Sequence, residues 1–256
     1  MSGSLSTCAR LAGATILAAA AASGAAAGTV QLRTPPPIAP DNAALPRIAA
    51  PATPQTARIN ASLARIDQTW RGFMKDCLGH GKASEVQLNR SVEVTLAGPR
   101  YVSIVAHDSE WCDGANNPSN SALALVYDLD AGKPVDWKAL LGPRLVATEA
   151  LDNSSDGTTI GTIAGPALQA LYVAAVKADP DIKGDKDWWS GCSEALTDPS
   201  LAFVAWPDAK KAGLVVTPSG LPHVVTACAE DEVIPLSRLR ADGADPGFIA
   251  AIAAGG

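Results

Sequence analysis

The sequence predicts an α+β fold with a mainly antiparallel sheet, helices packed on the sheet, and two disulfides. Three observations lead to this prediction. A helical stripe of apolar residues opens the body of the chain, and segments of alternating apolar and polar residues follow it. A second helical stretch separates the early strand segments from the late ones. Four cysteines remain in a chain that carries an export signal. The order helix, strands, helices, strands is typical of the α+β class.

Residues 1–27 have the layout of a secretory signal peptide. One positive charge, Arg10, precedes an uncharged run over residues 11–22, and small residues follow as far as Ala27. We expect cleavage after Ala27, with cleavage after Ala25 as the second choice. The alternative is an uncleaved membrane anchor, but residues 11–27 are short for a span and consist mostly of alanine and glycine. Export to the periplasm or the medium is therefore predicted.

Cleavage would leave 19 basic and 26 acidic residues, a net charge of −7, and the cysteines Cys77, Cys112, Cys192 and Cys228. Four cysteines allow three connectivities. We favour Cys77–Cys112 and Cys192–Cys228, because each pairing staples neighbouring elements and closes a loop of about 35 residues. The alternative is a zinc site. It is disfavoured because the cysteines are far apart in sequence and lack a histidine at ligand spacing.

Both ends of the exported chain have biased compositions. Residues 28–54 contain seven prolines, so the sequence predicts an extended, poorly ordered linker there. Residues 241–256 are rich in glycine and alanine and are expected to form a flexible tail. The folded domain is therefore predicted to span residues 55–240.

The elements of this domain can be assigned in order. Apolar residues at steps of three and four predict an amphipathic helix over 56–77. Strands are expected next over 86–96, 101–106 and 122–129, followed by a turn at 130–133 and a short helix over 135–141. A second helix is expected over 164–178, with Pro166 in its first turn. The last third predicts strands over 201–206, 213–217, 223–227 and 233–236.

Charge and motifs exclude several functions. An acidic chain of pI about 5.0 without a basic cluster is unsuited to nucleic acid. After signal cleavage no segment has 18 uninterrupted apolar residues, so no contact with the membrane is expected. The common signatures of hydrolases, metalloproteases and nucleotide-binding enzymes are absent from the sequence. We therefore expect a non-catalytic domain without cofactor or metal.

Several polar groups nevertheless deserve an interpretation. His107, Asp108 and Asp113 form the one polar cluster that could serve a hydrolase. The aspartates between Asp179 and Asp187 could bind calcium, but lysines interrupt them and a solvated loop is favoured. The acidic run 230–232 is expected at the surface. Trp188 and Trp189 could stack on sugar rings or anchor a protein interface, or they could simply fill the space beside a disulfide.

The centre of the chain also resembles a known family. The segments that carry the resemblance are the strand 101–106, the turn 111–118, the strand and turn 127–133, the stretch 135–141, and the late strands near 203–206, 213–216 and 233–236. Their order is similar to that of the RsiV-like extracytoplasmic domain family, a domain of unknown function, over residues 56–240. The family's Gly-Ala-His-Pro turn is replaced by residues 114–118, in which Asn116 stands for the histidine and one residue is inserted.

The resemblance implies a binding or sensing role at the cell envelope. Members of the family include the lysozyme-sensing ectodomain of an anti-sigma factor and a domain that precedes a peptidoglycan deacetylase. Lysozyme or peptidoglycan is thus the implied partner, and the expected binding residues are Asp113, Asn116, Asn117, Trp188 and Trp189. A lysozyme inhibitor would bind in the same way. The alternative is an envelope hydrolase that acts on glycan or peptide.

Overall fold

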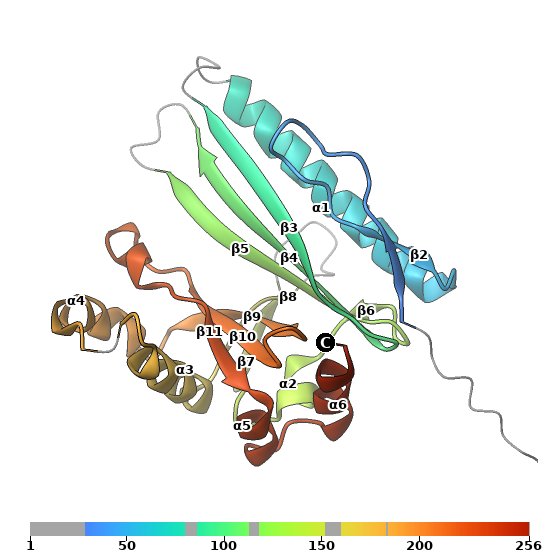
Figure 1. Cartoon of the computed structure of the whole chain (residues 1–256). Helices are drawn as coiled ribbons and strands as arrows, with labels where there is room; N and C mark the ends of the chain where they lie inside the picture. Colours follow the sequence, from blue (N-terminus) through green and yellow to red (C-terminus); the bar gives the residue numbers. More distant parts are fainter. Residues whose placement is uncertain (1–28, 80–85, 113–117, 152–159, 183, 256) are drawn as a thin grey trace, which may run out of the picture.

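A computed structural model describes residues 29–79, 86–112, 118–182 except 152–159, and 184–255. It has the predicted α+β architecture, with two large antiparallel sheets, a small two-stranded sheet, and helices on their outer sides (Figure 1). The predicted signal peptide, residues 1–27, lies outside the described residues. Within the described part of the chain, no helix is both long and apolar enough to cross a membrane.

The N-terminal segment is folded, and the prediction of a poorly ordered linker over 28–54 is wrong. It contains a two-stranded sheet of β1 (Gln31–Arg33) and β2 (Arg47–Ala50), which lies along helix α1 (Pro54–Gly79). Leu45 and Ile48 are buried against α1. Asp67 of α1 accepts a hydrogen bond from the Leu45 N–H at 3.1 Å and pairs with Arg47 at 2.7 Å. The few apolar residues between the prolines thus have a buried surface to occupy.

The first large sheet has the order β3-β4-β5-β6 and is antiparallel. Its strands are β3 (Gln87–Ala97), β4 (Tyr101–Trp111), β5 (Ser119–Asp128) and β6 (Lys133–Pro134). Successive residues of β4 face opposite sides, as the strand period requires. Ile104 and Ala106 pack toward α1, whereas Tyr101 and Val105 belong to the core on the other side.

The second large sheet has the order β11-β10-β9-β8-β7, again antiparallel. Its strands are β7 (Thr148–Leu151), β8 (Ile160–Ala164), β9 (Ala202–Asp208), β10 (Gly213–Ser219) and β11 (Glu232–Pro235). Strand β9 lies against β3, β4 and β5. The two sheets meet near β6 and diverge toward the far ends of β3, β4 and β5 (Figure 1).

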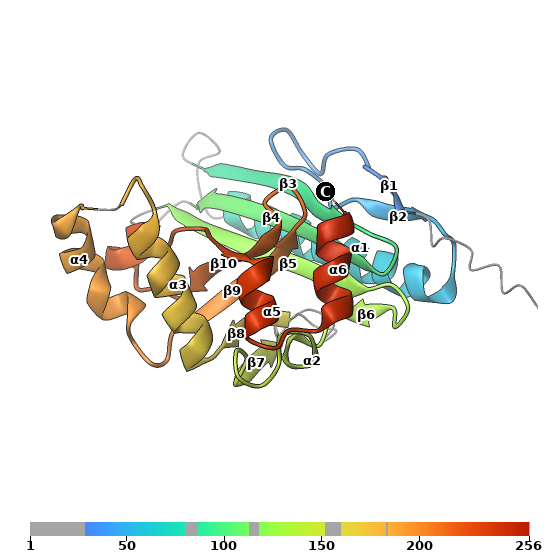
Figure 2. The ribbon, with the colours of Figure 1, turned by 60° about the horizontal axis from the view of Figure 1, so that its bottom comes forward.

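Helices cover the outer side of the second sheet and the end where the sheets meet (Figure 2). They are α2 (Trp137–Leu141), α3 (Pro166–Ala178), α4 (Lys186–Leu196), α5 (Leu236–Ala241) and α6 (Pro246–Ala254). The prediction of a flexible tail over 241–256 is wrong, because α6 buries Phe248, Ile249 and Ile252 in the larger core. Alanine-rich sequence suits a helix well, since alanine has the highest helix propensity.

Both disulfides have the predicted pairing. Cys77–Cys112 joins the end of α1 to the end of β4, and Cys192–Cys228 joins α4 to a 3-10 helix, η1 (His223–Cys228). The strand expected over 223–227 is therefore wrong. Its apolar pair Val224-Val225 suggested a strand, but Val224 is 88 % exposed and the segment turns back to reach Cys192.

Candidate functional site

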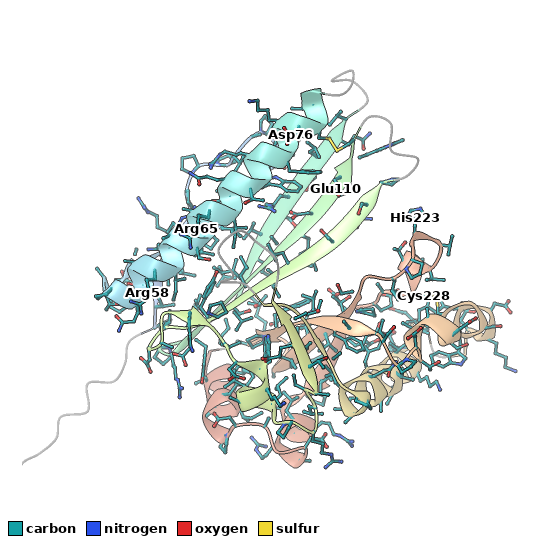
Figure 3. All side chains as sticks on the ribbon, turned by 180° about the vertical axis from the view of Figure 1, so that it is seen from behind. Arg58, Arg65, Asp76, Glu110, His223 and Cys228 are labelled. Atoms are coloured by element: carbon teal, nitrogen blue, oxygen red, sulfur yellow. A yellow bond between two sulfur atoms is a disulfide. The ribbon has the colours of Figure 1, made fainter. Side chains whose placement is uncertain are left out.

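A cleft opens where the two sheets diverge, and we call it the intersheet cleft. Its volume is about 830 Å³, within the range of small-molecule sites. One wall is the far half of the sheet β3-β4-β5, and the other is formed by β10, η1 and the segment that leads to β11. Figure 3 shows η1, marked by His223 and Cys228, across from the part of the sheet where Glu110 is labelled.

The sheet wall carries two rows of side chains that share one face. Asn89, Ser109 and Asn120 lie opposite one another on the three strands, and Ser91, His107 and Ala122 form the next row. Side chains paired in this way stand together on the same side of a sheet. The next row inward, with Val105 and Ala124, is already buried in the core. The same face of the sheet is thus apolar where the second sheet covers it and polar where it lines the cleft.

The second wall is held in place by covalent and backbone links. The end of β10 and the turn after it contribute residues 217–221, and η1 contributes Thr226 and Ala227. Cys228 directly follows these residues and is bonded to Cys192 of α4. The disulfide therefore anchors this wall to the helical layer. Ala229 and Asp231 continue the wall toward β11.

The lining is rich in neutral hydrogen-bonding groups. Hydroxyl and amide side chains come from both walls, and they include Asn89, Ser91, Ser109, Asn120, Thr217, Ser219 and Thr226. Neither lysine nor arginine is among the described lining residues. Such a surface can donate and accept many hydrogen bonds without a strong positive charge. It suits a neutral polar ligand better than a phosphate or another anion.

The polar cluster predicted for a hydrolase is not assembled by the described residues. His107 and Asp108 are neighbours on β4, so their side chains point to opposite faces. His107 faces the second sheet. Its ring lies edge-on to the Trp206 ring, with 6.2 Å between the two ring centres. Asp108 faces α1 and accepts two hydrogen bonds from Arg90, at 2.6 and 2.7 Å. The third member, Asp113, lies outside the described residues.

Of the five predicted binding residues, the structure describes Trp188 and Trp189. Trp188 and Trp189 lie on α4, are half-buried and pack against the larger core. The Lys177 ammonium stands 4.0 Å from the centre of the Trp189 ring, an arrangement typical of a cation–π contact. Neither tryptophan lines the intersheet cleft. Asn116 and Asn117, like Asp113, lie outside the described residues.

The acidic stretch that was expected to be a loop is partly helical. Asp185 is the N-cap of α4 and accepts hydrogen bonds from the Asp187 and Trp188 N–H groups, at 3.1 and 2.9 Å. Asp in this position is a common helix-start signal. Among the described residues, no three histidine, cysteine, aspartate or glutamate side chains are arranged to hold a metal ion.

The acidic run 230–232 contains a buried residue that the sequence did not predict. Glu232 was expected at the surface, yet it is only 8 % exposed. It begins β11, opposite Val216 of β10. Burial, together with the charges of Asp179, Glu230 and Asp231, raises its pKa to about 7. Alternation along β11, with Ile234 also buried, is the sequence signal that could have placed Glu232 inside.

No known family model matches the sequence. In structure, the chain is similar to a DUF3298 family protein from Pseudomonas aeruginosa PAO1, with 11% identity and a TM-score of 0.48, over 79% of this chain and 84% of the other. It is also similar to a DUF3298 family member from Bacteroides fragilis NCTC 9343, with 11% identity and a TM-score of 0.44, over 80% and 75% of the two chains. These neighbours are domains of unknown function. Their names state no catalytic activity.

Proposed function

We propose that this protein is an exported, non-catalytic domain of the cell envelope that binds the glycan of peptidoglycan in the intersheet cleft. The observation that carries the proposal is the lining of that cleft. Serine, threonine and asparagine side chains from both walls face a space of about 830 Å³. Sugar hydroxyl and acetamido groups need this mixture of donors and acceptors.

An aromatic residue at the end of β4 supports the same ligand. Trp111 is 39 % exposed and follows His107 and Ser109 at alternate positions of the strand. Alternate residues share a face, so Trp111 stands on the same face of β4 as the polar row, next to the residues that line the cleft. Indole rings provide a flat apolar surface with one N–H donor, which matches the face of a pyranose ring.

The disulfides and the surroundings of His107 support the same proposal. Two disulfides are typical of proteins that fold in an oxidising environment. Asp108 accepts hydrogen bonds from Arg90 on the face of β4 opposite to His107. Asp108 therefore does not orient the His107 imidazole, as the carboxylate of a catalytic pair would. The competing envelope hydrolase would need a base and a partner on the same side of the strand.

The test is a binding titration of the oxidised, signal-cleaved protein with N-acetylglucosamine tetramer, followed by tryptophan fluorescence and calorimetry. Saturable binding is expected, and Asn120→Ala should weaken it about tenfold because one paired amide is lost. Gln68→Ala, an exposed change on α1, is the matched control. Isolated sacculi and lysozyme serve as separate arms.

The outcomes separate the three candidate functions. Binding of the tetramer and of sacculi would support the glycan proposal. Binding of lysozyme alone would replace it with the sensor or inhibitor function. Release of shorter sugars from sacculi, abolished by His107→Ala, would instead establish the hydrolase.

A further inference from the structure

The N-terminal layer of the molecule is basic, although the chain as a whole is acidic. We call residues 29–79, which are the N-terminal segment and α1, the basic layer. This layer contains six basic and three acidic residues, whereas residues 80–256 contain 13 and 23. Its formal charge is therefore +3, against −10 for residues 80–256. A molecule whose charges are separated in this way is oriented by a charged surface.

The positive charges of the basic layer lie at its surface. The exposed basic residues are Arg33, Arg58, Arg65, Arg71 and Lys75. Two of them are labelled along α1 in Figure 3. The acidic residues compensate this charge only in part, because Asp67 is buried and already pairs with Arg47 at 2.7 Å. Asp41 and Asp76 are the exposed acids of the layer, so its surface keeps an excess of positive charge.

An apolar groove lies beside two of these basic side chains, at the C-terminal end of α1. Its volume is about 480 Å³, and it is lined by Ile38 of the N-terminal segment and by Arg71, Met74, Lys75, Leu78 and Gly79 of α1. Arg71 and Lys75 are four residues apart, as are Met74 and Leu78, so each pair stands on one side of the helix. Leu78 is 45 % exposed. Two positive charges thus border an apolar surface that is open to solvent.

An anionic lipid matches both properties of this surface. Its headgroup attracts the Arg71 and Lys75 side chains, and its apolar chains remove Met74 and Leu78 from water. A soluble anionic polymer would use the basic side chains alone and would leave the groove in contact with water. The combination of charge and exposed apolar surface therefore favours a lipid bilayer.

The basic layer and the intersheet cleft lie on opposite faces of the first sheet. Ile104 and Ala106 of β4 pack toward α1, whereas His107 and Ser109 line the cleft. Figure 1 shows α1 on one side of β3, β4 and β5 and the second sheet on the other. A surface that holds the basic layer therefore leaves the cleft open. The acidic remainder of the chain then points away from the anionic surface, which would repel it.

We propose that the basic layer docks on the surface of an anionic lipid bilayer, with Arg71 and Lys75 at the headgroups and Leu78 among the apolar chains. The sequence analysis expected no membrane contact, because no segment of the exported chain is apolar enough to span. Docking at the headgroups needs no spanning segment. This proposal goes beyond the glycan function and does not depend on it. It gives the protein a fixed orientation in which the intersheet cleft faces away from the membrane.

The test is vesicle flotation of the oxidised, signal-cleaved protein. One set of vesicles is phosphatidylcholine alone, and the other contains equal parts of phosphatidylcholine and phosphatidylglycerol. Soluble polyglutamate is a third probe. The variants are the double change Arg71→Gln/Lys75→Gln and the single change Leu78→Ser. The matched control is Lys210→Gln/Lys211→Gln, which removes two exposed charges outside the basic layer.

We expect binding to the anionic vesicles and none to the neutral ones. Arg71→Gln/Lys75→Gln should weaken this binding about 25-fold, which is about fivefold for each charge. Leu78→Ser should weaken it about fivefold, since less apolar surface is removed from water. The Lys210→Gln/Lys211→Gln control should bind as the unchanged protein does. Binding should also fall at about 0.5 M sodium chloride, because salt screens the charges.

Three results would overturn the proposal. They are equal binding to both kinds of vesicle, equal losses in the control and in Arg71→Gln/Lys75→Gln, and binding of polyglutamate without binding of vesicles. The last result would assign the basic layer to an acidic protein partner. A circular dichroism melt verifies that the variants are folded. Binding of N-acetylglucosamine tetramer by the same variants should be unchanged, so failure of the membrane contact and failure of the glycan function are distinguished.

Discussion

Arg90 and Asp108 face each other across β3 and β4 and form two hydrogen bonds in a buried site, at 2.6 and 2.7 Å. The Arg90 guanidinium also lies 4.2 Å from the centre of the Trp70 ring of α1. The indole N–H of Trp70 in turn donates a hydrogen bond to the Asn42 Oδ1 atom at 2.9 Å. This pair therefore links the sheet, α1 and the N-terminal segment. Because Asp108 points toward α1, its neighbours His107 and Ser109 point into the intersheet cleft.

Asp108→Ala is expected to lower the free energy of unfolding by about 3–5 kcal/mol, because it leaves the Arg90 charge buried and unpaired. Urea denaturation followed by circular dichroism measures the change. Arg100→Ala is the control, since the Arg100–Asp128 pair lies at the surface at 3.2 Å and should cost at most about 1 kcal/mol. Equal losses in the two variants would contradict the structural role of the Arg90–Asp108 pair.

Leu45→Ala tests whether the N-terminal segment belongs to the folded domain. Leu45 is fully buried in the smaller core, so its truncation should cost about 2–4 kcal/mol. Gln31→Ala, an exposed change on β1, should stay within about 0.5 kcal/mol. Denaturation curves of both variants provide the measurement. A neutral Leu45→Ala would restore the interpretation of this segment as a linker.

Sequence patterns identified the elements whose apolar residues recur with a regular period. The apolar stripe of α1 and the alternation in β4 are confirmed, as is the pairing of Cys192 with Cys228. The helical stripe and the alternation are local, because the residues that carry each signal are close in sequence. The cysteine pairs are not local, with separations of 35 and 36 residues, and they followed instead from the preference for pairing neighbouring cysteines along the chain.

The errors have a common physical origin in tertiary contacts. Nothing near Leu45 shows that Asp67, 22 residues later, accepts its N–H. The residues of η1 predict a strand from their sequence alone, but the Cys192–Cys228 disulfide holds this segment against α4. The intersheet cleft was the feature that the sequence predicted least, because it combines β3, β4 and β5 with η1, which comes much later in the chain. Trp188 and Trp189 were selected as a tryptophan pair next to Cys192, and they pack against the core rather than line the cleft.

Removal of the Cys192–Cys228 disulfide is expected to weaken binding as well as stability. Replacing both cysteines by alanine frees η1 from α4, and it should cost about 3–4 kcal/mol for a loop of this length. Because Thr226 and Ala227 line the cleft next to Cys228, affinity for N-acetylglucosamine tetramer should fall as well. The Cys77–Cys112 pair closes a loop of similar length, so its double variant calibrates the loss of stability. Unchanged stability after loss of Cys192–Cys228 would contradict this prediction.

Glu232→Gln should make the free protein more stable at neutral and alkaline pH. Burial is the main cause that raises the pKa of Glu232 from 4.5 to about 7. Between these two values the folded protein keeps the proton while the unfolded chain releases it, so the stability contributed by this group falls as pH rises. Glutamine does not titrate and avoids this loss. The variant should therefore gain about 1–3 kcal/mol at pH 8 and show little gain at pH 4.5. Urea denaturation at both pH values checks the sign. The same gain at both pH values would point to packing, whereas a loss at pH 8 would show that the carboxylate already has a partner within the fold.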